Sequence, residues 1–174
     1  MIDNGINRTG KIKQIPVSSL GQTEQINAIA NNEKLAMSTF DESKEILLAN
    51  KPPFLDILGF EDCFFDKKAE LFTAVFTPNV DMTHSKGTIV QGGFISGMLD
   101  SAMAQIVLYK HKFKVNPLTL KMDVTFILPC KPEQVFCESK ILKMGKSIVF
   151  TLAEMKQNNE IIATASATSK LIYL

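Results

Sequence analysis

Residues that bind metals or form disulfides are scarce in this chain of 174 residues. It has three cysteines, Cys63, Cys130 and Cys137, and two histidines, His84 and His111. The cysteines are odd in number, and none of these residues has the spacing of metal ligands. The sequence therefore predicts no metal site and no disulfide framework. With no setting that would lower their pKa, the thiols are expected to be packing or surface residues.

The chain also lacks an excess of charge and any long apolar run. Lys and Arg total 19 against 18 Asp and Glu, and neither sign forms a long block. This balance argues against a polyanion partner such as nucleic acid. No apolar run reaches the length of a membrane span, and the N-terminus has no basic start followed by an apolar core. We therefore expect a cytoplasmic protein that does not bind a membrane.

The length allows one domain with a terminal extension. The first 50 residues are rich in Asn, Gln and Ser and hold two sequences with capping-box spacing, SLGQ and TFDE. These sequences predict helices over 23–37 and 41–49. We expect an N-terminal helical extension over 1–50 and the main domain over 51–174. Two interpretations of the extension stay open, a cover for the domain or a second subunit and a loosely docked arm.

Strand patterns dominate the second half of the chain. Polar and apolar residues alternate from residue 118 onward, which predicts one apolar face made by Leu118, Leu120, Met122, Val124, Phe126 and Leu128. Further strands are predicted over 69–77, 134–143, 147–155 and 161–172. One strand, one long apolar helix and then a run of antiparallel strands predict an α+β domain. In such a domain a curved antiparallel sheet wraps around a central buried helix.

One carboxylate is isolated within that apolar helix. Between Lys86 and Lys110 the only charged side chain is Asp100, and the residues around it are good helix formers. A lone ionised carboxylate is costly to bury, so Asp100 would need a raised pKa or partners around it. Either condition suits a catalytic residue. The alternative is an Asp that reaches solvent or bonds to neighbouring backbone.

Three pieces of sequence occur in an order that is typical of one family. A Gln-Gly-Gly motif at residues 91–93 is followed by Asp100, and the strand over 118–129 ends in an aromatic residue, a hydrophobic pair and proline. A Gly-Lys-Ser motif at 145–147 then precedes another strand. Over roughly residues 54–174 the sequence resembles the hotdog-fold acyl-CoA thioesterases of the phenylacetate-pathway, or PaaI-like, type.

The resemblance implies an activity and roles for particular residues. It implies hydrolysis of a fatty or aromatic acyl-CoA, without a cofactor, by a homodimer or homotetramer with sites at the subunit interface. The N–H of Gly92 would donate to the oxyanion at the positive end of the buried helix. Asp100 would act as general base for water or as a nucleophile that forms a mixed anhydride. Thr119 would hold the attacking water, with its side chain opposite the apolar row of its strand.

Two positions depart from the family's pattern. Gln91 stands where the family typically has His, and an amide can orient a carbonyl but cannot transfer a proton near neutral pH. The loop before the glycine pair is one residue longer than usual, which leaves His84 or Ser85 at the family's Asn position. Together with Gly93, these two loop residues are the candidate substrate-binding residues.

A second function stays open beside the thioesterase. In a non-catalytic acyl-CoA or acyl-carrier binding hotdog protein, the apolar groove is kept and the loss of His marks lost chemistry. A hotdog dehydratase is disfavoured, because neither histidine lies beside the start of the helix. The apolar residues after the double proline are candidates either for an acyl pocket or for plain core, namely Phe54, Leu55, Leu58 and Phe60.

Overall fold

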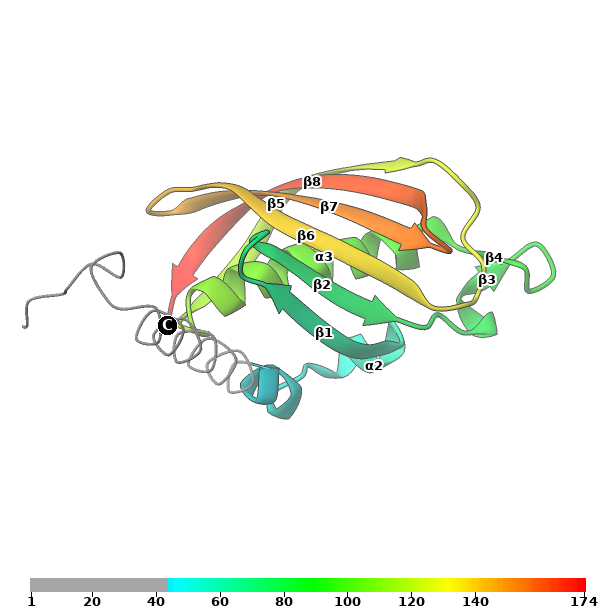
Figure 1. Cartoon of the computed structure of the whole chain (residues 1–174), viewed down its shortest axis with the longest axis horizontal. Coiled ribbons are helices and arrows are strands. Elements are labelled where there is room, and N and C mark those ends of the chain that lie inside the picture. Colours follow the sequence, from blue (N-terminus) through cyan, green and yellow to red (C-terminus); the bar gives the residue numbers. More distant parts are fainter. Residues whose placement is uncertain (1–43) are drawn as a thin grey trace, which may run out of the picture. The chain divides into compact units, whose positions relative to one another are not determined.

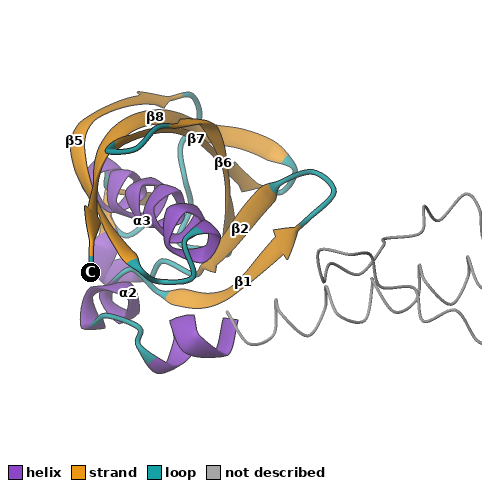
Figure 2. Ribbon diagram, turned by 90° about the vertical axis from the view of Figure 1, so that its left-hand side faces the viewer, coloured by secondary structure: helices purple, strands orange, loops and turns teal. Residues whose placement is uncertain are grey.

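A six-stranded antiparallel sheet curls around one long helix in the computed structural model of the chain, which describes residues 44–174 (Figures 1 and 2). The strand order is β1-β2-β6-β7-β8-β5. The strands are β1 (Phe60–Asp66), β2 (Leu71–Phe76), β5 (Val115–Phe126), β6 (Val135–Met144), β7 (Ile148–Gln157) and β8 (Glu160–Tyr173). The four late strands confirm the sequence prediction, whereas β1 was not predicted.

Before the sheet, the described residues open with a helical segment over 44–49 and the short helix α2 (Pro53–Ile57). Between β2 and the long helix lie a 3-10 turn, η2 (Val80–Met82), and a small ribbon of β3 (Thr83–His84) and β4 (Ile89–Val90). The helix expected over 23–37 and both capping-box sequences lie outside the described residues.

Helix α3 (Gly92–Lys110) fills the concave side of the sheet (Figure 2). It is apolar around most of its circumference, and Met98, Leu99 and Ile106 are completely buried. A backbone carbonyl of the helix is also bound to the sheet, because the hydroxyl of Ser139 on β6 donates to the oxygen of Ala102 over 2.8 Å. The expected hotdog arrangement of a curved sheet around a buried helix is therefore confirmed.

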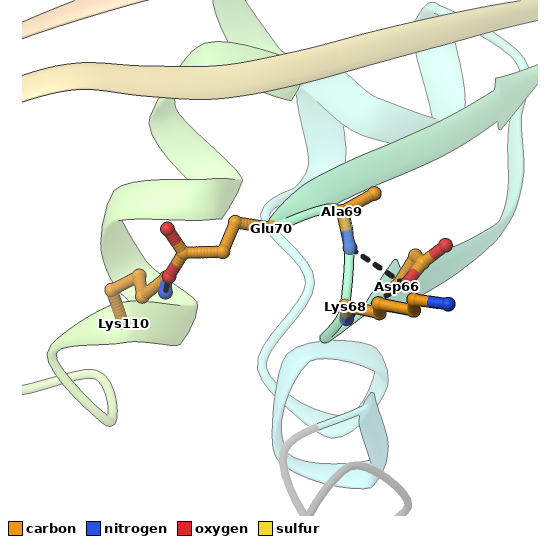
Figure 3. A network of polar contacts seen from close by, with 5 residues as sticks. All are labelled: Asp66, Lys68, Ala69, Glu70 and Lys110. Atoms are coloured by element: carbon orange, nitrogen blue, oxygen red, sulfur yellow. Dashed lines mark hydrogen bonds and ion pairs between the residues drawn. The ribbon is translucent and has the colours of Figure 1, made fainter.

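The last turn of α3 is linked to the turn between β1 and β2 (Figure 3). Lys110 Nζ lies 2.5 Å from Glu70 Oε1, and this contact lowers the pKa of the Glu70 carboxyl. In the same turn the Asp66 carboxylate accepts hydrogen bonds from the N–H groups of Lys68 and Ala69. Exposed ion pairs add little stability, so these contacts mainly fix the position of the helix end.

Strand β5 departs from the predicted alternation. Its pairing with β8 shifts between Thr119 and Lys121, which places a β-bulge at Leu120. Thr119 pairs with buried Ser169, and Met122 pairs with buried Ala167, so both side chains face α3. The residues before and in the bulge turn outward, with Leu118 at 46% and Leu120 at 60% exposure. The single apolar row was therefore wrong, because the extra residue reverses the alternation.

The turn from α2 into β1 depends on glycine. Gly59 has φ +73°, and its N–H and carbonyl bond to Asp56 and Thr77 respectively. A Cβ at this position would lie 2.2 Å from the Thr77 carbonyl oxygen. At Gly97, by contrast, a Cβ would lie 3.4 Å from the Leu58 side chain, which is an ordinary contact.

Alanine is therefore expected to have opposite effects at the two glycines. Gly59→Ala should lower the free energy of unfolding by about 2 kcal/mol or more, because it combines a left-handed backbone with a backbone clash. Gly97→Ala should raise it by about 0.5–1 kcal/mol, because alanine is the better helix former. Urea unfolding of both variants checks this. Equal urea midpoints for the two variants would contradict the different roles assigned to the two glycines.

Candidate active site

Gln91 is the N-cap of α3. Its side-chain oxygen accepts the Gly93 N–H over 2.6 Å, and its backbone carbonyl accepts the N–H groups of Phe94 and Ile95. The N–H of Gly92 has no acceptor within the described part of the chain. Of the first-turn donors, Gly92 is thus the one that can bind a ligand oxygen, at the positive end of a 19-residue helix. Gly93 was expected to bind substrate, but its N–H is occupied by the cap.

A cavity of about 350 Å³ lies at the end of β5, beside the start of α3. Gly92 lines this cavity with His84 and Phe126. The Phe126 ring lies 3.0 Å from where a Gly92 Cβ would be, so only glycine fits against the ring without a shift. His84 belongs to the β3–β4 ribbon, and its Nδ1 lies 2.7 Å from the Ser85 hydroxyl. His84 is thus near the helix start, whereas Ser85 does not line the cavity.

Asp100 lies two turns further along α3 and is half-buried. The Thr119 hydroxyl donates to its Oδ1 over 2.8 Å. The bulge in β5 makes this contact possible, because it turns Thr119 toward the helix and not away from it, as the alternation had predicted. Asp100 therefore has the polar partner that its isolation in the sequence called for. One carboxylate oxygen is held by Thr119.

Asp100 and Thr119 line a second cavity of about 520 Å³ between α3, β5 and the segment that contains α2. Its walls include Phe54 and Leu55. Two of the four candidate acyl-pocket residues therefore line a cavity, and one of these, Leu55, also belongs to the core together with Leu58 and Phe60. The wall also holds Gln105, which was not anticipated. Gln105 carries no charge, so the isolated charge that singles out Asp100 does not single out Gln105. A polar residue in an apolar helix is nevertheless itself a signal.

The predicted catalytic residues form two groups that are separated along α3. Gly92 and Asp100 are eight residues apart, which is about 12 Å along the axis of an α-helix. They line different cavities. An oxyanion donor and a base or nucleophile must both reach one thioester carbonyl within about 3 Å. Within a single chain these two groups cannot do so.

Other chemistry finds little support in residues 44–174. Burial raises the pKa of Cys63 and of Cys130 to about 11 and raises that of Cys137 as well, so the thiols stay protonated. No group of three potential metal ligands occurs among these residues. None of their helices combines the length and apolar character that a membrane crossing needs.

The curved sheet around one buried helix defines a structural class, the hotdog fold. The profile of the acyl-CoA thioesterase N-terminal domain family matches residues 80–169, and the chain belongs to this family. No curated protein sequence matches the chain.

Several solved structures share the fold. A thioesterase related to phenylacetic acid degradation from Ralstonia eutropha has 21% identity and a TM-score of 0.65 over 74% of this chain and 98% of its own. A thioesterase from Haemophilus influenzae has 12% identity and a TM-score of 0.66, over 78% and 91% respectively. A variant of the phenylacetic acid degradation protein PaaI from Thermus thermophilus has 17% identity and a TM-score of 0.59, over 68% and 98%.

The side-chain cap of α3 leads to a prediction about stability. Gln91→Ala should lower the free energy of unfolding by about 0.5–1.5 kcal/mol, because the Gly93 N–H loses its acceptor. Gln91→Ser is the matched control, since a serine N-cap can restore the bond and should keep most of the stability. Denaturant unfolding measures both. If both variants are as stable as the parent protein, the side-chain cap contributes nothing to the free energy of unfolding.

Proposed function

We propose that the chain is an acyl-CoA thioesterase that hydrolyses a fatty or aromatic acyl-CoA to the free acid and CoA. The observation that carries this proposal is the pair of groups on α3, a free N–H at Gly92 and a carboxylate at Asp100 bound by Thr119. Thioester hydrolysis needs both kinds of group, a donor for the oxyanion and a base or nucleophile. Membership of the thioesterase family supports the same conclusion.

In the proposed reaction the thioester carbonyl oxygen accepts the Gly92 N–H. As negative charge develops on this oxygen, the hydrogen bond and the helix dipole stabilise it. As general base, the Asp100 carboxylate takes a proton from water while the water oxygen attacks the carbonyl carbon, and the thiolate of CoA leaves. As nucleophile, the carboxylate attacks directly, CoA thiolate leaves, and water then hydrolyses the anhydride. Thr119 holds one carboxylate oxygen in either case.

The 12 Å between the two groups favours a site that two copies of the chain share. Among the described residues β5 bonds only to β8, so its other edge has no partner strand there, and Leu118 and Leu120 are exposed on β5. Long free edges with apolar side chains tend to pair with another strand. We therefore propose a homodimer in which β5 pairs with β5, and the same dimer is the unit of any homotetramer.

A single register of this pairing would complete the site. Thr119 touches Asp100, and Phe126 lies against Gly92. Antiparallel pairing that places Thr119 opposite Phe126 of a second copy therefore brings Asp100 of one copy to Gly92 of the other. The bulge residue Leu120 has no opposite residue in this pairing. All directly opposed side chains then lie on the same face of the sheet, and residue 123 of one copy lies opposite residue 123 of the other.

The register predicts a cross-link at Asp123. Opposed residues in an antiparallel pair have Cα atoms roughly 4.5–5.5 Å apart, within the range of a disulfide. Asp123→Cys should therefore form a disulfide-linked dimer on mild oxidation, visible on a non-reducing gel. The native cysteines are buried and should not interfere. Lys140→Cys, on central strand β6, is the control and should stay monomeric on the gel; equal cross-linking of both variants would refute the register.

The reaction itself is tested at Asp100. Asp100→Asn should lower turnover by a factor on the order of 10² to 10⁴, because the amide keeps the shape but cannot act as base or nucleophile. Binding of acyl-CoA should change little. Release of CoA from a panel of acyl-CoAs, followed with a thiol-reactive dye, measures turnover.

The same assay separates the two candidate functions. The alternative, a non-catalytic acyl-CoA or acyl-carrier binding protein, requires that neither the parent protein nor the variant releases CoA above the blank while acyl-CoA still binds. If instead the parent protein releases CoA and Asp100→Asn releases it at the same rate, the chain is a thioesterase but Asp100 takes no part in the reaction.

A further inference from the structure

One face of α3 is only partly covered in its second half. Asp100, Ala104 and Leu108 are partly exposed, whereas the residues between them, 101–103 and 105–107, are buried. Residues four apart in an α-helix differ by only about 40° around its axis, because 3.6 residues make one turn. The three residues therefore form a single stripe along the helix, and neighbours in the stripe are about one turn apart.

The 520 Å³ cavity follows this stripe. Asp100, Ala104 and Leu108 all line it, together with Thr119 of β5 and Phe113 of the connection between α3 and β5. Thr119 binds Asp100, and the N–H of Phe113 donates to the carbonyl oxygen of Leu108 over 2.9 Å. The cavity thus has a polar end at Asp100 and Thr119 and an apolar end at Leu108 and Phe113. On the stripe, Ala104 lies between the two ends.

The charges of the lining indicate which part of an acyl-CoA the cavity suits. Among the described residues that line it, Asp100 is the only one that carries a charge, and none is Lys or Arg. The phosphate groups of CoA are bound best by such cations, and a carboxylate repels them. The segment before β1 adds Leu47, Phe54 and Leu55 to the walls, and apolar walls favour an apolar ligand. The lining therefore suits the acyl group and not the nucleotide.

We propose that the cavity holds a straight fatty acyl chain that runs along α3 from Asp100 toward Leu108, and that Ala104 is the specificity-determining residue. This inference rests on the proposed thioesterase function and names its substrate class, fatty acyl chains long enough to pass Ala104. The stripe continues for about two helical turns, which suits an extended chain better than a single aromatic ring.

The small side chain of Ala104 is what leaves this path open. Methylene groups beyond the polar end are buried against the apolar walls, and the burial of each one favours binding. An acetyl group has no such methylene groups and occupies the polar end alone. A larger side chain at position 104 would fill the space between the two ends, so it would act against long chains far more than against acetyl.

The test compares acetyl-CoA, octanoyl-CoA and phenylacetyl-CoA, of which the last two have the same number of acyl carbons. The parent protein should favour octanoyl-CoA at least tenfold in kcat/KM over each of the others. Ala104→Leu should lower the ratio of octanoyl-CoA to acetyl-CoA at least tenfold. Ala104→Ser, which adds a single oxygen atom, is the matched control and should keep the ratio.

Melting curves check that the variants fold. Leucine is a good helix former, and the cavity has room for its added carbons, so Ala104→Leu should melt close to the parent protein. Ala104→Met is a second narrowing variant with a more flexible side chain. It should lower the same ratio and replaces Ala104→Leu if that variant does not fold.

The outcomes separate this inference from the thioesterase proposal. If the parent protein does not prefer octanoyl-CoA, if the preference survives in the folded narrowing variants, or if Ala104→Ser loses it too, the inference is overturned and the hydrolysis stands. If none of the three substrates is hydrolysed, the thioesterase proposal fails, and calorimetric binding of acetyl-CoA and octanoyl-CoA decides the role of the cavity. Tighter binding of octanoyl-CoA that disappears in Ala104→Leu supports that role, and equal binding by the parent protein refutes it.

Discussion

The need to cover a helix that is apolar on nearly every side is the constraint on which this structure depends. Exposure of such a helix would cost far more than any exposed ion pair could return. A curved sheet covers most of its circumference, and the segment before β1 packs against another part, where Leu58 meets Gly97. Gly92 at the start of α3 and Asp100 two turns further on are both only partly buried under this cover. The proposed chemistry comes from gaps in this cover.

Much of the fold could be predicted from the sequence, because local patterns specify it. The long helix, the four late strands and the turns between them follow from apolar periodicity and from glycine and asparagine at the turns. Strand β1 was missed because its sequence, FEDCFFD, has no clean alternation. The bulge in β5 was missed for a different reason. Leu118 and Leu120 fit a single apolar row, and only the pairing with β8 shows that they face outward.

The residues of the candidate site could be named from the sequence, but their arrangement could not. Asp100 and Thr119 meet, and Gly92 keeps a free N–H. Gln91 was expected to orient a substrate carbonyl, whereas its oxygen binds the helix start. The resemblance to a family assigns a role to each position, but it does not say which of these positions line the same cavity within one chain. Helix geometry supplies that information, since eight residues of α3 separate the two groups.

The bulge at Leu120 also limits which sequence changes β5 can accept. Substitutions along the strand alter one side chain each, but an insertion or deletion on either side of the bulge would turn every following side chain to the opposite face. Thr119 could then no longer face α3 together with Met122 and Val124. The length of this strand is consequently constrained more tightly by the fold than its composition is. Variants of the chain should accept new side chains on the outer face of β5 far more readily than a single added or lost residue.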